Sequence, residues 1–334
     1  MNIYGRISLL CLCGLSLCGC RKDLCYDHDM HGLNAQAQVT TSWECAWERP
    51  YEKHWRDAWS KEFGCTYESL CPEPATGVAS VVYHADGTHN ERHLSGEGGL
   101  LPMREGRHSI LFYNDDTNYI VFCDMESCAT ASVTTRTRTR STYSEMHSNE
   151  TTVNTPDILY GAWVESFEAV RSETPAALPI EMKPLVYTYL IRYEFEQGWQ
   201  YAALARGALS GMAESVFLRD GRTGNETATV LFDCTIEEFG AQAIVTSFGA
   251  PGFVDGNYTH RDRQHYGLNL EVRMKNGHLK TFEIDVTDQV EAQPRGGVIV
   301  VEGLSISEGE GGGEAGFDVD VDGWGDYEDI ELPL

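Results

Sequence analysis

Short stretches in which apolar and polar residues alternate recur along most of the chain, and this period of two is typical of half-buried β-strands. The clearest example is Leu185–Phe195, where every second side chain is apolar or aromatic while Arg192 and Glu194 fall on the other face. We therefore predict a strand there with one buried face and one solvated face. Further strands are predicted over 78–84, 110–113, 119–123, 159–167, 230–232, 244–248 and 298–304.

A β-hairpin is predicted toward the C-terminal end of this pattern. Leu268–Met274 alternates, Asn276-Gly277 follows it, and a second alternating run covers 279–286. Asn-Gly between two such runs is a strong hairpin signal, because both turn residues must accept a positive φ. Further turns are predicted at Asp86-Gly87 and Asp220-Gly221.

Helical patterns are few. One amphipathic helix is predicted after Pro50, since apolar residues recur there at the helical spacing i, i+3, i+4 and i+8 (Trp55, Ala58, Trp59 and Phe63). Tyr201–Phe217 is a second candidate helix, weakened by Gly207 and Gly211. Many short strands and few helices indicate an all-β chain built from β-sandwiches.

Three prolines divide the chain. Pro175, Pro179 and Pro184 lie within ten residues, so we predict a linker over 174–184. It separates an N-terminal β-sandwich domain, 37–173, from a C-terminal one, 185–334, that has an acidic end. A length of 334 residues accommodates two domains at about 150 residues each.

The N-terminal segment, 1–19, has the features of a signal peptide. It carries one charged residue, Arg6, and an apolar core from Ile7 to Leu17 that is too short to span a bilayer. Small residues precede Cys20, and the segment resembles a bacterial lipoprotein signal whose cleavage leaves Cys20 acylated. We expect residues 20–36 to be a polar tether, with the acyl chains on Cys20 inserted in the membrane.

Charge and cysteine content narrow the possible partners. The formal net charge is −26, which argues against nucleic-acid binding because that requires clustered Lys and Arg. Seven cysteines follow Cys20, and an exported location permits disulfides. Cys65/Cys71 and Cys123/Cys128 are possible pairs, and the odd number leaves at least one thiol unpaired.

The strongest metal-binding pattern lies near the C-terminus. Carboxylates at positions 1, 3, 5, 9 and 12 of a loop, with Gly323 at position 6, match the spacing of an EF-hand calcium loop (Asp318, Asp320, Asp322, Asp326 and Asp329). No helices are predicted on either side of it. The same residues also fit a strand whose valines are buried and whose acids are solvated, so calcium binding stays an alternative.

A basic stripe is predicted on a strand over 135–140. Thr and Arg alternate there, so Arg136, Arg138 and Arg140 would share one face. That face could dock an acidic partner. The favoured interpretation is a solvated sheet face that neighbouring Asp and Glu balance.

Catalytic chemistry finds no support in the motifs. The chain lacks G-x-S-x-G, H-E-x-x-H and a P-loop, so neither an enzyme nor a cofactor site is predicted. Four tryptophans offer a surface for stacking on sugars, but their spacing favours packing in a core (Trp43, Trp47, Trp55 and Trp59).

Several segments together resemble a known family. They are the lipoprotein-like sequence from Cys20, the Trp43/Trp47 and Trp55/Trp59 pairs, and the sequences at 111–122, 135–140, 209–213 and 282–288. On these segments the chain resembles the Bacteroides lipoproteins of the fimbrillin and minor-fimbrium anchor superfamily.

The resemblance implies two tandem transthyretin-like Greek-key β-sandwiches, lipid-anchored to the outer membrane and exposed at the cell surface. It implies a non-enzymatic role in fimbria assembly, anchoring or adhesion, with other fimbrial subunits as partners and strand addition between subunits as the contact. Only Cys20, as the acylation site, is carried over from the family. The alternative is a surface lipoprotein that binds glycans, or binds its ligand through calcium.

Overall fold

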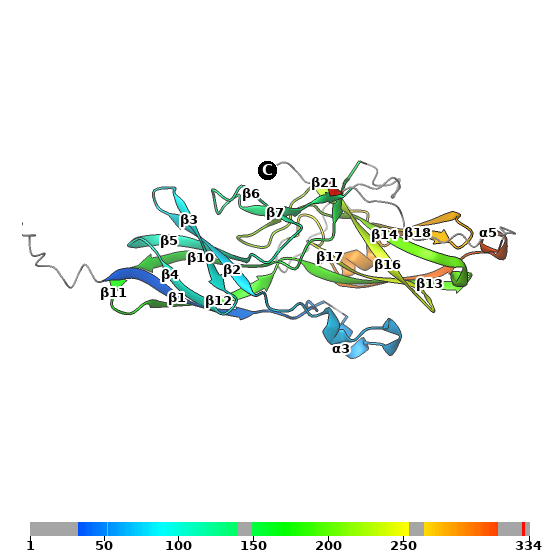
Figure 1. Cartoon of the computed structure of the whole chain (residues 1–334), viewed down its shortest axis with the longest axis horizontal. Coiled ribbons are helices and arrows are strands. Elements are labelled where there is room, and N and C mark those ends of the chain that lie inside the picture. The colour runs from blue at the N-terminus through cyan, green and yellow to red at the C-terminus, as the bar shows by residue number, and fades with distance from the viewer. Residues whose placement is uncertain (1–32, 52, 139–148, 254–263, 313–328, 331–334) are drawn as a thin grey trace, which may run out of the picture.

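A computed structural model describes residues 33–51, 53–138, 149–253, 264–312 and 329–330. Figure 1 shows two β-rich units that follow one another along the long axis, with short helices at their margins. This confirms an all-β chain of two units with few short helices. No helix in the described ranges is long and apolar enough to cross a membrane.

The first unit is a closed barrel of seven strands. Going round the barrel, the strands are β1 (Asn34–Trp43), β12 (Ala176–Pro184), β10 (Tyr160–Ala169), β5 (Gly106–Asn114), β2 (Gly77–His84), β3 (His89–Ser95) and β4 (Gly98–Pro102). β4 pairs with β1 and closes the ring. The short β11 (Arg171–Ser172) pairs with the start of β1.

The predicted linker is a barrel strand instead. β12 runs parallel to β1 over seven residue pairs, from Ala37↔Ala176 to Trp43↔Met182. Pro179 is tolerated because β12 pairs with β10 only at Lys183 and Pro184, so the edge of β12 at Pro179 needs no N–H donor on that side. Alternation explains the strand: Leu178, Ile180 and Met182 point inward and are buried.

The barrel interior is filled by apolar side chains from all sides. Phe112, Ile110 and Tyr160 are fully buried there. Each such side chain contributes about 1.5–3 kcal/mol of hydrophobic stabilisation. The interior is therefore a packed core and holds no channel.

The second unit is a curled half-barrel around its own core. Its strands follow the order β19 (Leu279–Asp285), β18 (Gly267–Met274), β14 (Ala202–Ala213), β16 (Thr227–Glu237), β17 (Gly240–Ser247), β13 (Tyr187–Gln197) and β20 (Gly297–Ser305). β13 and β20 are parallel, and the other neighbours in this order are antiparallel. The predicted hairpin is confirmed as β18–β19, with Gly277 at φ +82°.

Smaller strands connect the two units. β6 (Ile120–Cys123), β7 (Ser132–Thr135) and β15 (Val216–Phe217) form a three-stranded sheet. Its buried residues pack with the outward-facing side chains of β2 and β5 in one apolar cluster that includes Val81, Leu111, Val133 and Val216. β9 (Thr151–Asn154) pairs with β16, β8 (Thr137–Arg138) with β9, and β21 (Asp329–Ile330) with β8.

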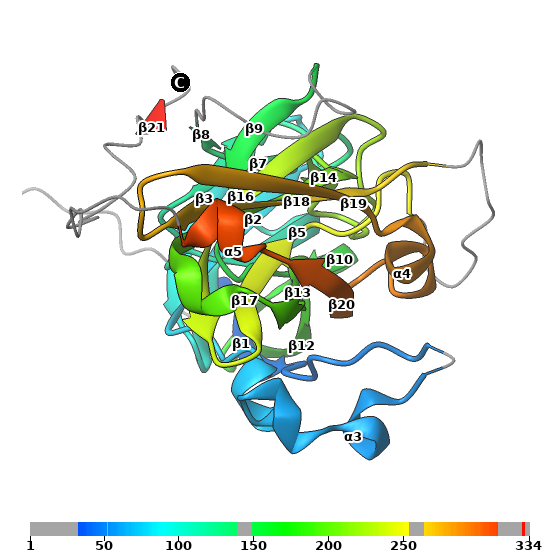
Figure 2. The same ribbon diagram turned by 90° about the vertical axis from the view of Figure 1, so that its right-hand side faces the viewer.

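An aromatic segment, which we define as residues 45–71, covers the outer face of β13 and β20. It contains α3 (Trp55–Ala58) and two 3-10 helices, Lys61–Phe63 and Tyr67–Leu70, and Figure 2 shows it on that side of the second sheet. Trp47 and Trp55 are buried and pack with Leu190 and Val298. Core packing of the tryptophans is confirmed, while the predicted helix is only one turn long.

This cover overturns the prediction of a solvated face on β13. Arg192 is only 3% exposed. Its guanidinium donates to Glu62 O at 2.6 Å, bonds Glu194 and lies 3.7 Å from the centre of the Phe239 ring. Both faces of β13 are therefore packed.

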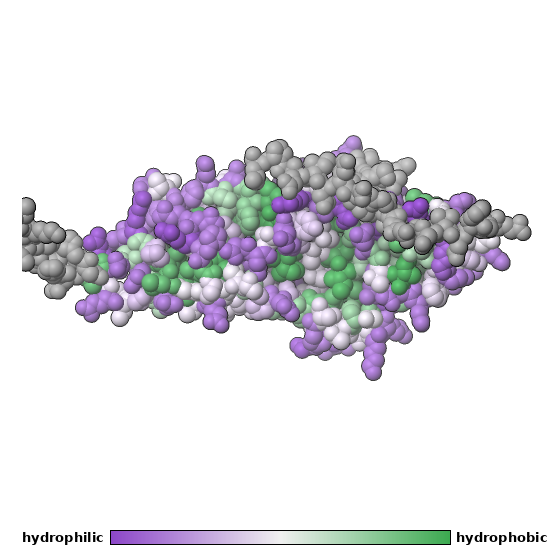
Figure 3. All heavy atoms as spheres, in the orientation of Figure 1, coloured by the Kyte–Doolittle hydropathy of each residue, from purple (hydrophilic) through white to green (hydrophobic). Residues whose placement is uncertain are grey.

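The predicted helix over 201–217 is wrong. Residues 202–213 form β14 in the middle of the second sheet, and only a short 3-10 turn, Trp199–Tyr201, precedes it. Gly207 is required there, because a Cβ atom would lie 2.1 Å from the Phe232 ring. In the described ranges, the remaining α-helices are α4 (Thr287–Ala292) and α5 (Glu308–Gly311). On the face shown in Figure 3, hydrophilic side chains are spread along both units, with smaller hydrophobic patches between them.

Candidate functional site

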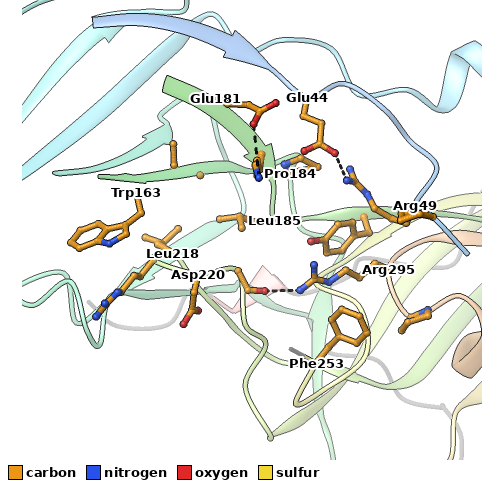
Figure 4. Close-up of a pocket in the computed structure, with 18 of the residues that line it drawn as sticks. Glu44, Arg49, Trp163, Glu181, Pro184, Leu185, Leu218, Asp220, Phe253 and Arg295 are labelled. Carbon is orange, nitrogen blue, oxygen red and sulfur yellow. Dashed lines mark hydrogen bonds and ion pairs between the residues drawn. The ribbon is translucent and has the colours of Figure 1, made fainter. Parts of the chain in front are cut away.

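A groove with a volume of about 980 Å³ lies where the barrel, the second unit and the start of the aromatic segment meet. We call it the junction groove. Strands β10 and β12 supply one side, and the loop 218–221 and residues 291–295 supply the other, as Figure 4 shows. Residues 44 and 49–51, together with Leu185, Tyr187 and Phe253, complete the lining.

The groove exists because β10 and β12 diverge. They pair only at Tyr160↔Pro184 and Gly161↔Lys183, after which β10 follows β5 and β12 follows β1. Gly161 allows the close approach at the base of the groove, since a Cβ atom there would lie 2.7 Å from Leu185 Cδ1. The two strands therefore leave a wedge-shaped opening between them in the barrel wall, and this opening is the groove.

Two arginines flank Tyr187 at one end of the groove. The guanidinium of Arg49 lies 5.6 Å from the centre of the Tyr187 ring, and that of Arg295 lies 5.3 Å from it. Arg295 also lies 4.2 Å from the Phe253 ring centre and donates to Gly221 O at 3.1 Å. Arg49 forms an ion pair with Glu44. Stacking and hydrogen bonds hold both cations in place.

Tyr51 joins the aromatic segment to this end of the groove. Its hydroxyl oxygen accepts a hydrogen bond of 2.6 Å from the backbone N–H of Arg295. Burial raises the pKa of Tyr51 above its usual range, so the hydroxyl stays protonated at neutral pH.

Trp163 marks the other end, on β10. The Arg219 guanidinium lies 5.4 Å from the centre of its ring. Glu181 and Lys183, both exposed on β12, lie 3.9 Å apart between carboxylate and ammonium. The lining combines aromatic, apolar and charged side chains of both signs.

The two edges of the second sheet differ. At β20, the side chains of Gln289, on α4, and Gln293, the residue after α4, bond the backbone N–H and C=O of Val300 and Val298, respectively, at 2.9–3.0 Å. These amides occupy the edge as a neighbouring strand would. At β19, β18 is the only pairing strand within the described ranges.

A salt bridge closes one end of the gap between these edges. Lys280 on β19 donates to Ser305 O at 2.9 Å and to both oxygens of Glu310 at 2.8 Å. The bond from Lys280 is the main reason that the pKa of Glu310 is lowered to about 2, so the carboxylate is ionised at neutral pH. β19 and β20 are thus held at this end without strand pairing.

The predicted arginine stripe does not form one strand. β7 ends at Thr135, and the chain bends at Arg136, whose N–H donates to Tyr119 O at 2.9 Å. Arg138 lies on β8, in the other sheet, and its guanidinium lies 3.6 Å from the Asp233 carboxylate. Arg140 lies outside the described residues. These contacts favour the balanced sheet face over an exposed docking stripe.

The other predicted positions are mostly outside the described ranges. Cys20 is among them, as are four of the five calcium candidates: Asp318, Asp320, Asp322 and Asp326. The fifth, Asp329, is a residue of β21 opposite Arg138. The described residues contain no cluster of three or more His, Cys, Asp or Glu that could hold a metal ion. Cys65, Cys71, Cys123 and Cys128 are thiols.

Sequence reasoning missed the junction groove. Its lining comes from six separated segments between residues 44 and 295, and their meeting depends on the pairing of distant strands. The sequence pattern placed Trp163 in a predicted strand and Pro179 and Pro184 in a predicted linker. Neither prediction indicates that these residues share a surface.

Comparison with known proteins places the chain among relatives. The domain of unknown function DUF5119 matches residues 68–233. The chain is 23% identical over 298 residues to the Bacteroides ovatus protein described as "Putative fimbrium anchoring subunit Fim4B", covering 80% of this chain and 88% of the relative. A crystal structure of a "putative adhesin" from Bacteroides ovatus superimposes with a TM-score of 0.58 at 18% identity, over 82% of this chain and 93% of that one. The fold is therefore shared along both units.

Proposed function

We propose that the chain is a member of the Bacteroidales family of fimbrial anchors and adhesins, and that it anchors a fimbrium at the bacterial surface. One observation carries the proposal. β1 begins at one end of the long axis, while α5 and the neighbouring ends of β19 and β20 lie at the other (Figure 1). A tether at the first end and a subunit at the second would hold the fimbrium away from the membrane.

Lipid on Cys20 is the proposed membrane attachment. The signal-like segment before Cys20 supports it, and two or more acyl chains suffice for stable anchoring. The barrel would then be the unit nearer the outer membrane, and the second unit would face outward. The proposed function consists of attachment and adhesion, which agrees with relatives that are described as a fimbrium anchoring subunit and an adhesin.

The proposed docking site for a further fimbrial subunit is the edge of β19. An edge strand offers backbone donors and acceptors to an added strand, and its alternate side chains set the register. Leu279 and Thr281 are exposed on this edge. The Gln289 and Gln293 side chains that bond β20 leave fewer free backbone groups at that opposite edge, which supports β19 as the docking edge.

We also propose that both units derive from the transthyretin-like Greek-key sandwich implied by the resemblance. A sandwich whose two sheets pair at their edges becomes a closed barrel, as in the first unit. A sandwich whose two sheets pair at only one edge becomes a curled half-barrel, as in the second unit.

Two experiments test the function. Cys20→Ala should remove incorporation of a palmitate analogue and release the protein from the membrane fraction, while the matched Cys18→Ala should do neither. Persisting label in Cys20→Ala would contradict lipid anchoring.

For docking, Leu279→Lys/Thr281→Lys should reduce co-purification of fimbrial subunits from native membranes, because charged residues on an edge disfavour strand addition. Glu196→Lys, on the exposed end of β13, is the control. Unchanged co-purification with the β19 variant would refute β19 as the docking edge.

A further inference from the structure

We infer that the junction groove binds an uncharged oligosaccharide. The inference deepens the adhesive side of the proposed function, and it rests on that function by naming the class of ligand that the surface protein would hold. Its volume of about 980 Å³ lies at the upper end of the range of about 300–1,000 Å³ for small-molecule sites. The groove is thus large enough for several sugar rings.

The charges of the lining suit a neutral polyol. Four basic side chains are present, Arg49, Lys183, Arg219 and Arg295, and four acidic ones, Glu44, Glu181, Asp220 and Glu291. An anionic ligand would meet the carboxylates, and a cationic ligand would meet the guanidinium groups. Hydroxyl groups donate to carboxylates and accept from guanidinium and ammonium groups, so a sugar can use both sets.

The balance is local as well as overall. Glu181 and Lys183 lie side by side on β12, and Asp220 follows Arg219 in the loop across the groove. Each wall thus presents a donor next to an acceptor. Adjacent hydroxyls of a pyranose ring can use that arrangement, since one can donate while the next accepts.

Aromatic side chains provide the apolar part of the site. Trp163 lies at one end, and Phe253 lies at the other, near Arg295 (Figure 4). Trp163 is half-buried, so part of its surface faces the groove. Aromatic rings bury large, rigid surfaces, and the C–H faces of sugar rings are their apolar counterparts. Phe253 is itself buried, so the exposed part of Trp163 is the stacking surface, and the charged pairs along the groove extend the site beyond a single sugar.

An extended peptide fits this groove less well. Pro50, Pro179, Pro184 and Pro294 contribute to the lining and have no backbone N–H. A peptide bound by strand addition needs those donors. Recognition here depends instead on side chains, which is the mode that suits a polyol.

The test uses the detergent-solubilised full chain on a printed array of neutral oligosaccharides, acidic oligosaccharides and extended peptides. The expected result is binding to neutral oligosaccharides. Trp163→Ala should weaken it at least tenfold, and Glu181→Gln/Lys183→Gln should weaken it severalfold. Because Trp163 also packs against its neighbours, the second variant, whose side chains are exposed, separates lost recognition from lost folding.

Trp199→Ala is the matched aromatic control, since Trp199 lies outside the groove, in the short turn before β14. Binding of peptides or acidic sugars alone, no binding on the array, or equal loss in Trp199→Ala would overturn the inference. Co-purification of fimbrial subunits with the groove variants distinguishes the two proposals, because it should stay intact even when sugar binding is lost.

Discussion

Gln293, at the end of α4, links this helix to β20 and to the aromatic segment. Its replacement should therefore lower the free energy of unfolding. Its Oε1 accepts hydrogen bonds from Val298 N–H at 2.9 Å and from Trp55 Nε1 at 2.6 Å, and its Nε2 donates to Val298 O at 3.0 Å. The residue is 6% exposed. One buried amide therefore covers the edge of β20 and fastens the aromatic segment to it.

Gln293→Met keeps the side-chain length and removes every one of these bonds. Two buried donors, Val298 N–H and Trp55 Nε1–H, lose their acceptor. At about 1–3 kcal/mol for each orphaned donor, the loss is about 2–6 kcal/mol, which is a large part of a typical total stability of about 5–15 kcal/mol. Urea unfolding followed by tryptophan fluorescence measures it, and hydrogen exchange of the Val298 amide locates it.

Gln289→Met is the matched control. Gln289 bonds Val300 in the same way, but it is only half-buried and water can replace the lost bonds. Its loss should be about 1 kcal/mol or less. If Gln293→Met were as stable as the wild type, or no less stable than Gln289→Met, the reasoning from buried unsatisfied donors would be refuted.

Two further predictions concern buried polar pairs. Burial, and then the neighbouring His108 and Arg104, lower the pKa of His84, whose Nδ1 lies 3.0 Å from that of His108. The unfolded chain then binds more protons, so stability should be complete above the ordinary pKa of 6.5 and fall as the pH drops below it. Melting temperatures across this range should show the loss, and His84→Gln should lessen the pH dependence; an equally steep dependence in that variant would contradict the assignment. Glu271→Ala should lower the free energy of unfolding by about 3–5 kcal/mol, because it leaves Arg206 buried without its carboxylate. Denaturant titration measures this loss. Glu181→Ala, which breaks the exposed pair with Lys183, is the control and should cost little. A loss below about 1 kcal/mol in Glu271→Ala would contradict the prediction.

The strands were predictable where one face is buried and the other is not. Over 279–285 the burial alternates at every residue, and the hairpin with β18 follows the sequence pattern directly. The helix prediction over the residues of β14 was wrong for the opposite reason. Nearly all of its residues are buried, so the apolar residues show no period of two and a helix could not be distinguished from a buried strand.

The linker prediction failed because proline content is not by itself evidence of a break. Pro179 sits in a strand that leaves most of one edge unpaired, a condition that only the arrangement of β1, β10 and β12 creates. The same arrangement produces the junction groove. Trp163 was assigned to a strand correctly, but nothing local to it indicates that residues 218–221 lie across from it.

By itself, the sequence determined the all-β character, most of the strands, the β18–β19 hairpin and the packing role of the tryptophans. These properties depend on alternation and turn chemistry within a few residues, which the chain carries locally. The tertiary structure alone decided the place of β12 as a barrel strand, the burial of Arg192 beneath the aromatic segment, the covering of the β20 edge and the groove at the junction. Each of these joins segments far apart in the chain, and which partner a strand edge or an apolar face meets is set by packing of the whole molecule.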